Sequence, residues 1–159
     1  MSGLEAAAFI LNASDVSCKV IAAAIDYGQK VKAARQQMES LRCEMREVSK
    51  LLDDLRARAT KAKEDDGTLE QWPSLKNIDE KDSPMSRMRL ELCAVLDLLG
   101  SQKMSRVEHL LWPRKMKKIE KSMQQISKHR DILIERMKID TGSVVACHLL
   151  LVYAQAYLI

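Results

Sequence analysis

The chain has 159 residues, 47% of them apolar, which suffices for one hydrophobic core and leaves no room for a second domain of ordinary size. Only five Gly, three Pro, two Trp, three Tyr and one Phe occur, a composition that favours helices over a sheet. The net charge of +4 is unevenly distributed, because residues 1–100 carry 15 basic and 17 acidic side chains whereas residues 101–140 carry 11 and 5. The positive excess therefore lies in one segment.

The four cysteines give no sign of a metal or redox site. Cys18, Cys43, Cys93 and Cys147 lie 25, 50 and 54 residues apart, so no pair has the short spacing of zinc ligands or of a redox dithiol. We expect buried thiols in a reducing cytosol. The N-terminal residues have no basic segment and place Glu5 ahead of the apolar run, unlike a secretory signal. The sequence predicts a cytoplasmic protein.

Helical periodicity predicts two helices in the first 62 residues. Residues 4–25 repeat at alternating steps of three and four, which predicts a first helix with one mostly apolar stripe formed by Leu4, Ala7, Leu11, Ser14, Cys18, Ile21 and Ile25. After a bend near Gly28, the same rhythm continues over residues 31–62 and predicts one long second helix of about 45 Å. Its buried seam is expected to face Leu92 and Ile126 of later helices through Met38, Leu41, Met45, Val48 and Leu52.

Residues 63–84 are acidic and contain one Gly and two Pro, so we expect a connector with one short helical turn. Ser83 is expected to cap a third helix that Pro84 opens and Gly100 ends. A break near Trp112-Pro113 is expected to precede a basic helix, which Asp140-Thr141-Gly142 should stop. Residues 143–159 are uncharged; we expect a fifth helix packed on the bundle, with a tail anchor or an aberrant C-terminus as the alternatives.

The basic helix carries a cluster of positive charge near its start. We call the residues that form it the basic cluster: Arg114, Lys115, Lys117, Lys118 and Lys121. Such a patch attracts phosphate, whether of lipid or of nucleic acid. Contact with a protein partner and a merely solvated helix face remain the alternatives. No aromatic residues interleave the basic ones and no reader motif is present, which argues against nucleic acid as a partner.

The expected fold class is an all-α helical bundle of four to five helices, with residues 1–142 as one unit and 143–159 as its C-terminal addition. The chain has no phosphate-binding glycine loop, nucleophile elbow or metalloprotease motif, and its "HRD" at residues 129–131 lies in a helical pattern without other kinase motifs. His109 and His148 are isolated. We expect no enzyme, no catalytic, cofactor or metal site, and no small-molecule substrate.

Three segments together resemble a known family. They are "GLEAAAFILNASDVSCKVIAAAIDYGQKVKAARQQMESLRCEM", then "DSPMSRMRLELCAVLDLL", then "LLWPRKMKKIEKSMQQISKHRDIL", which contains a hydrophobic-Trp-Pro step followed by a basic Lys-x-x-x-Ile-Glu-Lys helix. Over residues 3–141 this order resembles the HeLo-like N-terminal domain of fungal NLR-like (STAND) proteins. That domain is related to the four-helix membrane-permeabilising domain of the mixed-lineage kinase-like pseudokinase.

The resemblance implies a signalling or effector module in regulated cell death, allorecognition or defence. Such a module oligomerises on activation, is recruited from the cytoplasm to the plasma membrane and permeabilises it. The membrane-inserting positions implied here are Leu4, Ala7, Ala8, Phe9, Ile10 and Leu11, which the resting fold is expected to shield. The alternative is a helical interaction module without membrane activity. The sequence ends at Ile159, before any nucleotide-binding region, so a fragment and a free-standing module both remain open.

Overall fold

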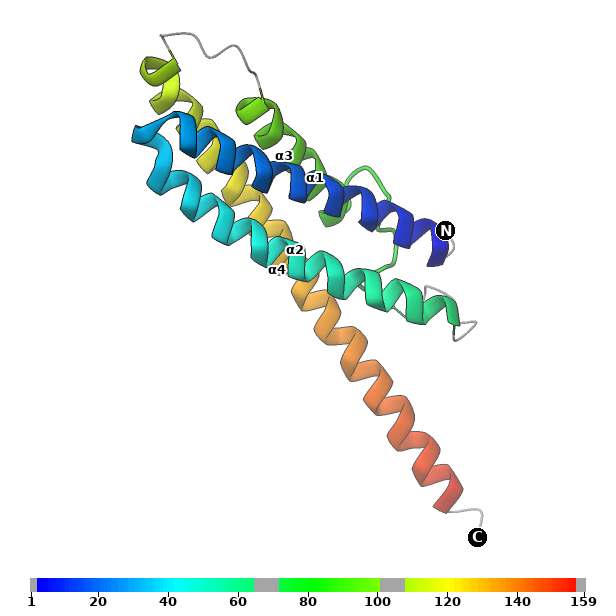
Figure 1. Ribbon diagram of the computed structural model, residues 1–159. Helices are drawn as coiled ribbons and strands as arrows, with labels where there is room; N and C mark the ends of the chain where they lie inside the picture. The colour runs from blue at the N-terminus through cyan, green and yellow to red at the C-terminus, as the bar shows by residue number, and fades with distance from the viewer. Residues whose placement is uncertain (1–2, 65–71, 101–107, 157–159) are drawn as a thin grey trace.

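The computed structural model describes residues 3–64, 72–100 and 108–156, and these form four α-helices and no strand. The helices are α1 (Gly3–Lys30), α2 (Arg35–Glu64), α3 (Pro84–Gly100) and α4 (Glu108–Ala156). In Figure 1, α1 and α2 run antiparallel as a hairpin, α3 lies along α1, and α4 crosses behind α2. The predicted all-α bundle with a long second helix is confirmed.

Helix α1 packs against α2 and α3, and α3 packs against α4, whereas α2 and α4 touch at few points. The hairpin turns at Val31, whose extended backbone (φ −116°, ψ 96°) separates α1 from the short 3-10 helix Lys32–Ala34. Gly28 allows a close approach of α1 and α2 just before this turn, because a β-carbon there would lie only 3.1 Å from Cβ of Met38. The bend that the sequence predicts near Gly28 is therefore a tight corner between two closely packed helices.

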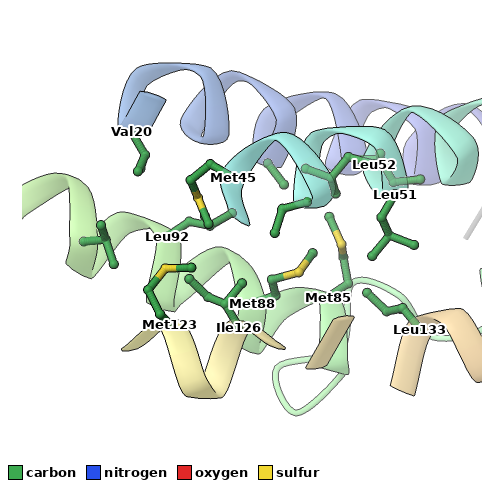
Figure 2. Close-up of a cluster of buried hydrophobic side chains, with 14 of the residues drawn as sticks. Val20, Met45, Leu51, Leu52, Met85, Met88, Leu92, Met123, Ile126 and Leu133 are labelled. Atoms are coloured by element: carbon green, nitrogen blue, oxygen red, sulfur yellow. The ribbon is translucent and has the colours of Figure 1, made fainter. Parts of the chain in front are cut away.

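The core lies between all four helices, and within it the seam of α2 faces residues of α3 and α4, as predicted. Figure 2 shows Met45 and Leu52 of α2 facing Met88 and Leu92 of α3, with Ile126 of α4 beneath them. Each of these five side chains is at most 1% exposed. The predicted seam is buried along its whole length, through Met38, Leu41, Met45, Val48 and Leu52.

The described part of the connector is a folded element rather than a loose link. Residues 72–83 form successive turns, in which the Leu75 amide donates to the carbonyl of Trp72 (2.8 Å). Trp72, Leu75 and Ile78 are buried and extend the core. Ser83 caps α3 as predicted. Its hydroxyl accepts a hydrogen bond from the amide of Ser86 at 3.0 Å and donates one to the carbonyl of Ile78 at 2.6 Å. Residues 65–71 lie outside the described residues.

Two predicted ends of helix α4 are wrong. The expected break near Trp112-Pro113 is absent, because α4 already begins at Glu108 and continues through Pro113. Pro113 is the sixth residue of α4, so it lacks the one backbone amide that would bond to the carbonyl four residues earlier, and the rest of the helix is unaffected. Helical continuity also lets Trp112, only 5% exposed, stack on Tyr27 with 5.1 Å between ring centroids.

The expected stop at Asp140-Thr141-Gly142 is also wrong, because α4 runs on to Ala156. A glycine inside a helix costs only about 1 kcal/mol relative to alanine, which continuing helix on both sides offsets. There is accordingly no separate fifth helix at 143–156. Figure 1 shows this end of α4, in orange and red, extending away from the other helices instead of packing on them. Residues 157–159 lie outside the described residues.

Candidate functional site

Helix α1 buries a different stripe from the predicted one. Its buried residues include three alanines and one serine, and they are Ala6, Ile10, Ala13, Ser17, Val20, Ala24 and Tyr27. Small side chains let α1 approach α2 closely, and the hydroxyls of Ser17 and Ser49 lie 3.1 Å apart between the two helices. The buried face is therefore rotated by about 100°, one residue position, from the predicted stripe.

The opposite face of α1 carries an apolar stripe that the fold leaves exposed. We call it the outer stripe, and it consists of Leu4, Ala8, Leu11, Asp15, Cys18, Ala22 and Ile25, all exposed. Leu4 is 61%, Leu11 48% and Ile25 37% exposed. The predicted burial of Leu4, Leu11, Cys18 and Ile25 is thus wrong; of the predicted stripe, Ala7, Ser14 and Ile21 are half-buried.

The six predicted membrane-inserting positions are divided between these two faces. Leu4, Ala8 and Leu11 are exposed, Ala7 and Phe9 are half-buried, and Ile10 is fully buried. Phe9 is partly covered by Arg89 of α3, whose guanidinium lies 5.4 Å from the ring centroid. The folded chain therefore does not shield this segment completely, contrary to our expectation. By length and mean hydropathy (1.5), α1 could also cross a membrane, a property that it shares with core helices of soluble proteins.

A charged pair lies in the middle of α1, where Asp15 of the outer stripe pairs with the neighbouring Lys19. The Lys19 ammonium contacts the Asp15 carboxylate at 2.6 Å, with both side chains more than half exposed. The hydrogen bond to Asp15, together with its negative charge, raises the pKa of Lys19 above its ordinary value of 10.5. Lys19 is therefore charged at neutral pH.

The basic cluster lies in the first turns of α4 that the structure describes in full. Arg114, Lys117, Lys118 and Lys121 are exposed, and none forms an ion pair with any described residue. Lys115 is half-buried, because its ammonium lies over the ring of Tyr27, 5.7 Å from the centroid. The structure therefore presents four of the five cluster residues to solvent.

The basic cluster and the start of α1 lie at opposite ends of the bundle (Figure 1). Tyr27 touches both Trp112 and Lys115, which places the cluster beside the C-terminal end of α1. From Ala8 to Tyr27 the helix rises about 29 Å at 1.5 Å per residue. A flat surface can meet both regions only if α1 lies roughly parallel to it.

A buried ionic network is a feature that the sequence did not reveal. The Asp140 carboxylate is fully buried and accepts hydrogen bonds from the amide and the hydroxyl of Ser74, the first at 3.0 Å. Arg58 of α2 completes the network with an ion pair to Asp140 at 3.1 Å. The network joins α2, the connector and α4.

Chemically reactive groups are scattered over the described residues. No group of three His, Cys, Asp or Glu is placed there to hold a metal ion. A groove of about 550 Å³ separates α2 from α4, and its walls mix apolar side chains such as Ile119 with polar ones such as Gln37 and Glu44. Cys18 and Cys43 are exposed and Cys93 is half-buried, all as free thiols, so the predicted burial of thiols is wrong for the first two. The prediction for Cys147 lies outside the described side chains.

Comparisons of the chain with known protein families, with curated proteins and with solved structures found no match.

Proposed function

We propose that this chain is a non-enzymatic effector module that binds anionic membranes, oligomerises and permeabilises them. On the resemblance of its sequence to HeLo-like domains, it would serve as the N-terminal domain of a fungal NLR-like protein in regulated cell death, allorecognition or defence. The observation that carries the proposal is the exposed basic cluster, whose four solvent-facing cations have no carboxylate partner among the described residues. Such a cluster attracts the phosphates of an anionic lipid surface.

The outer stripe of α1 supplies the second requirement, which is apolar contact with lipid. Leu4 and Leu11 are exposed in the folded chain, so they can reach a membrane without unfolding of the bundle. The charged pair Asp15–Lys19 in the middle of α1 makes full insertion of a single copy costly. Permeabilisation therefore requires several copies that shield one another's charged groups.

Vesicle binding tests the role of the basic cluster. Each lysine near an anionic surface contributes about 1 kcal/mol, so the triple variant Lys117→Gln, Lys118→Gln and Lys121→Gln should bind anionic vesicles about 100-fold more weakly. Lys115 is left in place because it packs on Tyr27.

The matched control is a triple variant with the same charge change at exposed lysines elsewhere, Lys61→Gln, Lys76→Gln and Lys81→Gln. It should retain nearly all of the binding. Equal loss in the two triple variants would show that only net charge matters, and would remove the basic cluster as a membrane site.

Dye release from anionic liposomes tests permeabilisation. Leu11→Glu should leave the fold intact, because Leu11 is 48% exposed, and should abolish release. Leu90→Glu on α3 is the control, since Leu90 is 52% exposed and lies outside the outer stripe. Wild-type protein that releases no dye, even when oligomerised by chemical cross-linking, would exclude permeabilisation.

The second candidate function is a helical interaction module without membrane activity. The observation that favours it is the same Asp15–Lys19 pair, which suits a protein partner better than the interior of a lipid bilayer. Binding of vesicles without dye release, or no binding at all, would support this candidate.

A further inference from the structure

The outer stripe of α1 has the spacing of a helix–helix contact. Its residues alternate in steps of four and three from Leu4 to Ile25, an average of 3.5, which is the repeat of a two-helix coiled coil. All of them are exposed, while the bundle is held by the other face of α1. The fold itself therefore gives no reason for this second apolar stripe.

The sizes of the side chains follow the same repeat. The large Leu4, Leu11 and Ile25 and the thiol of Cys18 recur every seven residues, and the small Ala8 and Ala22 lie between them. Large residues that alternate with alanine fit an antiparallel copy of the same helix, because each large side chain can pack over an alanine of the other copy.

We propose that a second copy of this chain covers the outer stripe, with the two α1 helices antiparallel. In this register Leu11 packs against Ala22 of the second copy, and Ile25 packs against Ala8 of the second copy. Leu4 and Ala8 then lie beside the C-terminal part of the partner helix. This inference does not depend on the proposed membrane function.

The charges favour the antiparallel arrangement. Asp15 lies near the two-fold axis in this register, where it faces Cys18 of the second copy and lies within one helical turn of the second copy's Lys19. Each Asp15–Lys19 pair, 2.6 Å apart within one chain, is then joined by its symmetry mate in a four-charge cluster of alternating sign. A parallel pair would instead place Asp15 against Asp15 and leucine against leucine, with gaps at both alanines.

A lipid bilayer can cover the apolar ends of the stripe, but it is a poorer cover than a second copy for the charged middle of the stripe. Its hydrocarbon interior offers no partner to the central charges, which are expensive to place there. The α1 helix of a second copy offers charges of opposite sign to Asp15 and to Lys19.

The contact area predicts a weak, reversible dimer. From Leu4 to Ile25 the stripe is about 32 Å long, and a helix is about 10 Å wide, so each copy contributes on the order of 300–400 Å². Stable interfaces usually bury about 800 Å² per partner. We therefore expect dimers at high protein concentration that dissociate on dilution.

Disulfide cross-linking tests the register. In a background with all four native cysteines replaced by serine, three variants are compared under mild oxidation: Leu11→Cys, Ala22→Cys, and both together. The antiparallel register brings position 11 near position 22 of the other copy and keeps identical positions about 16 Å apart along the axis, beyond the reach of a disulfide.

The double variant should therefore form covalent dimers, at least tenfold more than either single variant. An equal mixture of the two single variants should also cross-link. Single variants that cross-link as well as the double variant would overturn the antiparallel register, because they indicate a parallel pair. Failure of all three to cross-link would overturn it too.

Sedimentation velocity over a range of concentrations tests the dimer without engineered cysteines. Wild-type protein should shift from monomer to dimer, and Leu11→Arg should remain monomeric at every concentration while unfolding at an unchanged temperature. Leu90→Arg, at a similarly exposed position outside the stripe, should dimerise like the wild type. A wild-type protein that stays monomeric, or a Leu11→Arg variant that still dimerises, would overturn the proposal.

Discussion

Replacement of Asp140 by alanine should be among the most destabilising single changes in this protein. The substitution leaves the amide and the hydroxyl of Ser74 unpaired, and Ser74 is only 1% exposed. Each buried group left without a partner costs about 1–3 kcal/mol. The Arg58 guanidinium loses its ion pair but keeps a hydrogen bond to the carbonyl of Met137 at 3.3 Å, and its side chain is 26% exposed. We expect a total loss of about 3–5 kcal/mol, a third or more of the stability of an ordinary domain.

Urea denaturation followed by circular dichroism measures this loss. Ser74→Ala should lose less, about 1.5–3 kcal/mol, because Asp140 keeps the backbone amide and Arg58 as partners. Asp131→Ala on the same helix is the control, since its side chain is 64% exposed and its pair with Arg130 is long at 3.4 Å; it should change stability by less than about 0.5 kcal/mol. A loss below about 1 kcal/mol for Asp140→Ala would refute the reasoning.

Three further predictions concern the core, a helix cap and pH. Leu52→Ala should cost about 2–5 kcal/mol in urea denaturation because Leu52 is fully buried, whereas Leu90→Ala, at a 52% exposed site, should cost little. Ser83→Ala should cost about 0.5–2 kcal/mol, since it removes the cap of α3, and a loss confined to experimental error would contradict the cap. Burial, together with the charge of Lys128, lowers the pKa of His129 below its ordinary value of 6.5. Because the unfolded chain then binds protons more readily than the folded chain, the free energy of unfolding should fall as pH drops below about 6.5. That fall should be smaller in His129→Gln, measured by denaturation at successive pH values.

The sequence predicted the α2 seam and the cap of α3 correctly because each rests on strong local physics. In α2 the large apolar residues Met38, Met45 and Leu52 recur on one stripe with charge on the other faces, so only one orientation buries them. Ser83 followed by Pro84 is a cap and a first helical residue that suit little else. In both cases a few neighbouring residues determine the outcome.

The orientation of α1 could not be predicted in the same way, because apolar residues occur on both of its faces. Hydrophobicity favours burial of the stripe with the larger side chains, Leu4, Leu11 and Ile25. The structure buries the smaller stripe instead, because alanines and Ser17 allow α1 to approach α2 closely. Hydrophobicity alone does not predict this close approach of α1 to α2.

The course of α4 and the environment of Asp140 depend on contacts between distant residues. Aspartate near glycine is typical of a helix end, so the sequence predicts a stop at Asp140. In the structure Asp140 instead pairs with Ser74 and Arg58, which lie 66 and 82 positions away in the sequence. Pro113 likewise predicts a break in the helix. The contact of the neighbouring Trp112 with Tyr27 favours the continuous helix instead. Neither contact is visible in a local window of sequence.

The two faces of α1 also explain why this helix suits a switch better than α2, which has nearly the same length. The residues that α1 buries include three alanines and Ser17, and among its fully buried side chains only Ile10 is large. Helix α2 contributes Met38, Met45 and Leu55, each at most 1% exposed. Because the stabilisation from burial grows with apolar area, separating α1 from the bundle costs less than separating α2. The outer stripe offers compensating apolar contacts, either to a second copy or to lipid. In buried apolar side-chain area, movement of α1 is therefore less costly than movement of α2.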